Sequence, residues 1–157
     1  MKALDAAVFL ALALLASGCS NQKILRSDTP LSRRAASVEM QDFPFPKSAH
    51  SIYYLFSAGG LQDLSQFVRF EVDSRELDSC VDALVSWNNK QTSRTLPYSR
   101  EALASAIVPV PETRFLPMLW WDPETISRGY YRGNNEGYTL QIFVDQERSR
   151  IYVFQND

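Results

Sequence analysis

The sequence predicts an α+β domain: an antiparallel sheet of about five strands with one main amphipathic helix, residues 74–88, packed on one face. Three features lead to this fold class. Short segments alternate apolar and polar residues, one stretch has helical apolar spacing, and glycine- and asparagine-rich turns join the last segments. A single domain is expected over residues 49–157, because residues 20–48 are polar and aperiodic, as in a flexible tether.

The first two strands are expected at residues 51–57 and 66–73, joined as an antiparallel pair by a loop of about eight residues. The second has the clearest alternation in the chain. Its inward positions are Val68, Phe70 and Val72, and its outward positions include Phe67 and Arg69. Ahead of this pair, Phe43 and Phe45 alternate with prolines, and we expect them to dock on the domain edge.

The main helix follows directly. Asp73 is the expected N-cap, and Glu76 stands three residues later, where its side chain can reach back to the free backbone donors. One apolar stripe then recurs at helical spacing and ends before Asn88 and Asn89; it consists of Leu77, Cys80, Val81, Leu84 and Val85.

The C-terminal half is less regular. A short helix is expected at 99–106, and a proline-rich excursion follows from Val108 to Pro123, because its prolines exclude helix interiors and central strands. Asp122, Pro123 and Glu124 predict another helix start, which Gly129 stops. The last three strands are expected at 128–132, 138–145 and 150–154, with a glycine- and asparagine-rich turn between the first two.

The N-terminus carries an apolar run, Ala6 to Ala16, which is too short to cross a bilayer and has the length of a signal-peptide core. The segment that follows, Leu15 to Cys19, reads LASGC and resembles the lipobox of bacterial lipoproteins. The resemblance implies that the signal peptide, 1–18, is removed and that Cys19 carries fatty acyl chains at the start of the tether, 19–48. It also implies export and lipid anchoring to a bacterial membrane on its periplasmic or extracytoplasmic side, with inner and outer membrane both left open. An ordinary secretory signal cut elsewhere is one alternative, and an uncleaved segment or a mispredicted start is the other.

Composition narrows the function. Residues 49–157 hold ten basic and fourteen acidic side chains, a net charge of −4, which argues against nucleic acid as a partner. The chain has one histidine, His50, and Cys80 is the only thiol besides Cys19. These are too few ligands for a His/Cys zinc site, and no cofactor is expected. Cys80 lies on the apolar stripe, so we expect an inert buried thiol rather than a nucleophile paired with His50.

Two clusters contain residue types that bind or react. In the segment 117–124, Trp120 and Trp121 could stack on sugar rings, and Asp122 and Glu124 are the acid pair that a glycosidase requires. A proline helix start explains the two acids equally well. The second cluster is the polar turn 134–136, for which a hairpin role is the simpler interpretation.

Aromatic side chains are the remaining candidates. Phe67, Tyr53 and one of Tyr130 and Tyr131 are expected to face outward, where they would form an apolar patch for a partner. The favoured function is therefore a lipid-anchored, non-enzymatic lipoprotein that binds an envelope protein through this aromatic face or through the proline-rich loop. A small-ligand or glycan-binding module using Trp120 or Trp121 is the alternative, and a hydrolase is the third.

Overall fold

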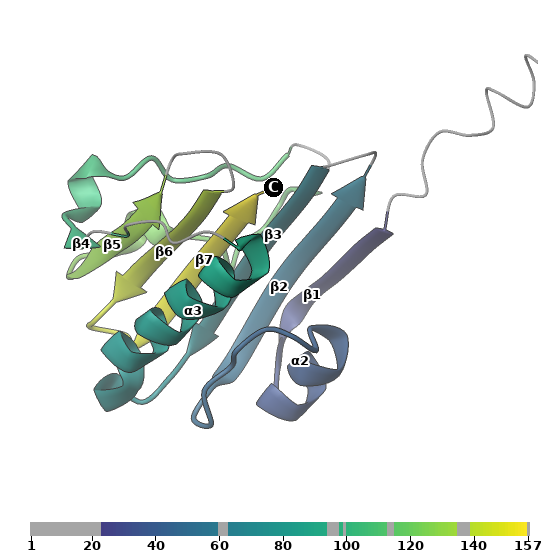
Figure 1. Cartoon of the computed structure of the whole chain (residues 1–157), viewed down its shortest axis with the longest axis horizontal. Helices are drawn as coiled ribbons and strands as arrows, with labels where there is room; N and C mark the ends of the chain where they lie inside the picture. Colours follow the sequence, from purple (N-terminus) through teal and green to yellow (C-terminus); the bar gives the residue numbers. More distant parts are fainter. Residues whose placement is uncertain are drawn as a thin grey trace, which may run out of the picture.

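The computed structural model describes residues 23–59, 63–93, 98, 100–112, 115–134 and 139–156. These residues form one seven-stranded antiparallel sheet in the order β1-β2-β3-β7-β6-β5-β4, with the helix α3 across one face (Figure 1). The predicted α+β class is confirmed, but the sheet has seven strands rather than five. The elements are β1 (Lys23–Leu31), α2 (Arg33–Glu39), β2 (His50–Gly59), β3 (Asp63–Glu71), α3 (Leu77–Thr92), β4 (Arg100–Glu101), β5 (Gly129–Asn134), β6 (Thr139–Asp145) and β7 (Arg150–Asn156).

The five predicted strands are all present, as β2, β3, β5, β6 and β7. The two additional strands are the edges of the sheet. β4 has only two residues, in the segment for which a short helix was expected; a 3-10 turn at Leu103–Ser105 follows it. β1 lies in the segment expected to be a tether.

The prediction of a flexible tether is wrong from Lys23 onward. β1 pairs with β2 from Lys23 opposite Ala58 to Ser27 opposite Tyr54, and α2 then begins at a cap in which Ser32 accepts from the Ala35 amide. The sequence looks aperiodic because an edge strand with several exposed residues on both faces does not alternate cleanly.

The expected docking of the two phenylalanines ahead of β2 is confirmed. Phe43 and Phe45 are buried, and their rings lie 6.1 and 5.5 Å from the ring of Phe70. These contacts extend the core across residues that carry no regular pattern.

One core lies between the sheet and α3. The predicted helical stripe is confirmed: Leu77, Cys80, Val81 and Leu84 are buried with Val68, Phe70 and Val72 of the sheet, and Val85 packs against this cluster. The cap differs from the predicted one. Glu76 accepts a hydrogen bond from the Ser48 hydroxyl (2.6 Å), and that hydroxyl accepts one from the Asp73 amide (3.2 Å). Ser48 therefore links the Glu76 side chain to the Asp73 amide, where a direct contact was expected.

A second core lies on the opposite face of the sheet. It is covered by residues 102–126, which we call the strap; residues 113 and 114 lie outside the described ranges. The strap contributes Phe115, Met118, Trp120 and Trp121, and the sheet contributes Leu55, Phe67, Tyr131, Phe143 and Tyr152. The helix expected at Asp122 is only a 3-10 turn, Pro123–Thr125.

The strap corrects the prediction of a bare aromatic face. Phe67 and Tyr131 are buried beneath it, whereas Tyr130 is buried on the α3 side of the sheet. Tyr53 is only partly buried and packs against the strap core. None of the helices in the described ranges is long and apolar enough to cross a bilayer.

Candidate functional site

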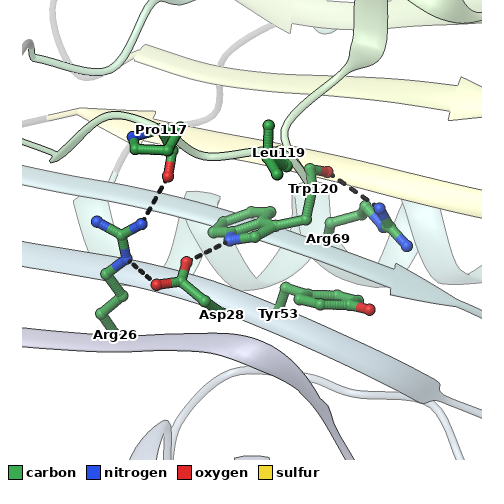
Figure 2. Close-up of a pocket in the computed structure, with 7 residues that line it drawn as sticks. All are labelled: Arg26, Asp28, Tyr53, Arg69, Pro117, Leu119 and Trp120. Carbon is green, nitrogen blue, oxygen red and sulfur yellow. Dashed lines mark hydrogen bonds and ion pairs between the residues drawn. The ribbon is translucent and has the colours of Figure 1, made fainter.

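A polar clamp joins the strap to the edge strand β1 (Figure 2). The guanidinium of Arg26 donates to the carbonyl oxygens of Phe115 (2.7 Å) and Pro117 (2.8 Å), and its Nε lies 2.6 Å from Asp28. The other oxygen of Asp28 accepts from the indole Nε1 of Trp120 at 3.0 Å. Two β1 side chains therefore hold three strap residues, through charge-assisted bonds that also satisfy two strap carbonyls.

A pocket of about 530 Å³ opens beside this clamp. Its wall includes Tyr53, whose ring stacks on that of Trp120 at 5.8 Å, and Arg69, whose guanidinium lies 4.5 Å from the Tyr53 ring. Arg69 also donates to the Trp120 carbonyl at 3.2 Å. Leu119 completes the wall with an 88% exposed side chain (Figure 2). The cations and the indole are largely occupied by contacts within the protein, and Leu119 is the wall residue most available to a partner.

The strap ends in a partly buried ion network. Arg150 contacts Glu71 at 2.9 Å and donates to the Tyr152 hydroxyl at 3.2 Å, and that hydroxyl donates to Asp122 at 2.8 Å. Burial raises the pKa of Tyr152 to about 12, and the hydrogen bond to Asp122 acts in the same direction. Asp122 is thus a structural acceptor, while Glu124 is exposed. The geometry gives no support to these two acids as a catalytic pair.

The other sequence candidates for chemistry are also separated. Cys80 is buried in the α3 core, where burial, with a contribution from Glu76, raises the pKa of its thiol to about 12. The His50 ring instead contacts the Ser48 carbonyl (2.9 Å) and Glu71 (3.6 Å). Among the described residues, no group of three His, Cys, Asp or Glu side chains is placed to hold a metal ion.

Both tryptophans proposed for ligand stacking are core residues, with 4% of Trp120 and 7% of Trp121 exposed. Trp121 makes edge-on contacts with Phe67 (4.9 Å) and Tyr152 (5.7 Å), and its Nε1 donates to the Pro109 carbonyl at 2.9 Å. Neither indole face is open to a sugar ring. Cys19 and the turn residues 135–136 lie outside the described residues.

The exposed apolar surface is on the strap itself. Its large apolar side chains include four that project outward: Ile107 (78% exposed), Val110 (81%), Leu116 (50%) and Leu119 (88%). Sequence reasoning named the proline-rich loop as one of two partner surfaces. It missed Arg26 and Asp28, which it assigned to the tether and which no local pattern distinguishes.

The comparisons with known proteins add no relative. The chain matches no protein family, and no curated protein or solved structure is significantly similar to it.

Proposed function

We propose that this chain is an exported, lipid-anchored, non-enzymatic binding domain that contacts a protein of the cell envelope through the outer surface of its strap. The anchor is Cys19, at the lipobox-like sequence. The contact surface is formed by the four outward apolar side chains of the strap and by the adjoining pocket.

One observation supports the strap above other surfaces. Six large apolar side chains are exposed in the described part of the chain, and four of them belong to the strap; the other two are Ile24 and Val38. Exposed apolar patches are typical of partner sites, and we propose that these four side chains belong to one.

The strap is also preorganised. Three of its carbonyls accept hydrogen bonds from Arg26, Arg69 and Trp121, and several of its side chains are packed in the core. A partner then orders little additional chain on binding, which lowers the entropic cost of association. The pocket beside Leu119 offers space for an anchoring side chain of the partner, the arrangement typical of interface hot spots.

A small ligand in this pocket is the second candidate. The volume of about 530 Å³ is sufficient for one, and the partly exposed Tyr53 offers an aromatic surface in place of the buried indoles.

The experiment is site-specific photo-crosslinking in cells. A photoreactive residue at Leu119 or Val110 is expected to trap one discrete partner, and the same residue at Val38 is the control, because Val38 is 68% exposed on α2. Leu119→Asp should abolish the crosslink formed from position 110 without lowering the midpoint of unfolding, and Val38→Asp should change neither. Identical crosslinks from all three positions would refute the strap surface.

The anchor is tested separately. Fatty-acid labelling and mass spectrometry of the mature chain should find acyl chains on Cys19, and Cys19→Ala should release the protein from membranes. An unmodified Cys19 in the mature chain would refute lipid anchoring.

A further inference from the structure

The sheet begins very close to the anchor. Only three residues separate Cys19 from Lys23, the first residue of β1. However these three are arranged, four Cα–Cα steps span at most about 14 Å. The predicted tether of some thirty residues is thus replaced by a connection shorter than the sheet itself, since the ten residues of β2 extend over roughly 33 Å.

We propose that the corner of the sheet formed by the start of β1 and the end of β2 rests on the lipid headgroups of the bilayer, with the opposite end of the strands standing clear of it. This inference rests on the proposed function, because it requires Cys19 to be lipidated.

The corner is held in place by strand pairing and by contacts with other elements. Lys23 lies opposite Ala58, and the register continues without a shift to Ser27 opposite Tyr54. Two residues inside the corner are tied to other elements: Leu25 packs against the α3 core, and Arg26 clamps the strap. The corner cannot move away from the anchor unless β1 separates from β2 and these contacts break.

The side chains at this corner fit a headgroup layer. Lys23 is exposed and offers an ammonium group to lipid phosphates, while its aliphatic stem tolerates an apolar layer. Ile24 beside it is 46% exposed. A small pocket of about 190 Å³ adjoins the corner, with apolar walls from Leu25, Phe56 and Trp87.

The short connection also limits where the partner can be. Arg26 lies three residues beyond Lys23, or about 10 Å along the strand. The part of the strap that Arg26 holds, at Phe115 and Pro117, is therefore presented close above the headgroups. A partner that reaches it is embedded in, or bound to, the same membrane surface.

The test uses the lipidated full chain in liposomes that contain a lipid spin-labelled at its headgroup. A fluorophore is attached to Ala58→Cys at the corner, or to Gln146→Cys in the exposed turn after β6. Thr139, at the start of β6, lies level with the corner, so the turn is about 20 Å farther along the strands. Cys80 is buried and stays unlabelled. Lys23→Cys is a second corner probe in case the change at position 58 perturbs folding.

The matched control is a 20-residue Gly/Ser insertion between Gln22 and Lys23, which adds a mean reach of about 25 Å. We expect the corner fluorophore to lose most of its emission, the Gln146→Cys fluorophore to keep it, and the insertion to restore emission at the corner. Equal corner quenching with and without the insertion, or equal quenching at both ends, would overturn the inference. Mass spectrometry of the same samples distinguishes a failure of this inference from a failure of the proposed function. An unmodified Cys19 refutes both. An acylated Cys19 with an unquenched corner refutes this inference alone.

Discussion

Replacing Arg26 by methionine tests whether the strap is clamped. The substitution keeps most of the aliphatic stem but removes the two hydrogen bonds to the carbonyls of Phe115 and Pro117, together with the ion pair to Asp28. Asp28 would keep the hydrogen bond from Trp120.

The magnitude follows from these contacts. A hydrogen bond that involves a charged group stabilises a protein by about 1.5–3 kcal/mol when it is shielded from water. The Arg26 side chain is 26% exposed, so water replaces part of what is lost. If this exposure reduces each bond to about 1–2 kcal/mol, the loss of both lowers the free energy of unfolding by about 2–4 kcal/mol.

Urea unfolding measures this loss, and hydrogen exchange locates it. The Trp121 amide, which donates to the Met118 carbonyl within the strap, should exchange much faster, while amides of β6 should change only with global stability. Arg34→Met is the matched control, because Arg34 is exposed on α2. A loss no larger than that of the control, or a Trp121 amide with unchanged protection, would refute the clamp.

Three further predictions concern the two cores. Trp121→Ala should lower the free energy of unfolding by about 3–5 kcal/mol because it opens a cavity in the strap core, whereas Leu119→Ala should change it by less than about 0.5 kcal/mol in the same urea titration. Cys80 should not react with a thiol reagent until the chain unfolds. Because burial raises the pKa of its thiol, the thiol ionises more easily in the unfolded chain than in the folded one. The free energy of unfolding should therefore fall as the pH rises above about 8.5. Asn88→Ala should cost about 1–3 kcal/mol by calorimetry, because it leaves the buried Tyr98 hydroxyl without its 2.6 Å donor.

The elements predicted from sequence are those whose burial follows a period. In β3, Val68 and Phe70 face one core while Phe67 faces the other, which is the alternation that marked the strand. The stripe of α3 is equally regular. β1 has no such period because it is a partly exposed edge strand, and β4 is too short to have one. Because the prediction used only the local sequence pattern, it assigned β1 to the tether.

The candidate site was less predictable for a different reason. Trp120 and Trp121 were named as candidates for ligand stacking, but residue type alone does not show which surface they cover. That depends on contacts between distant segments: Arg26 and Asp28 are separated from their strap partners by about ninety residues in the chain. The same contacts turn the aromatic face into a core and leave the strap as the outer surface.

The strap covers one face of the sheet without regular secondary structure, and this requirement explains much of its composition. A helix satisfies its own backbone, whereas an irregular cover leaves amides and carbonyls that need partners. Prolines remove some of the amides, and side-chain donors from Arg26, Arg69 and Trp121 satisfy the carbonyls of Pro117, Trp120 and Pro109, among others. Prolines, arginines and buried indoles are thus accounted for by folding. The outward Ile107, Val110, Leu116 and Leu119 are not, since none of them belongs to either core. Their exposure is the feature of the strap on which the proposed binding function rests.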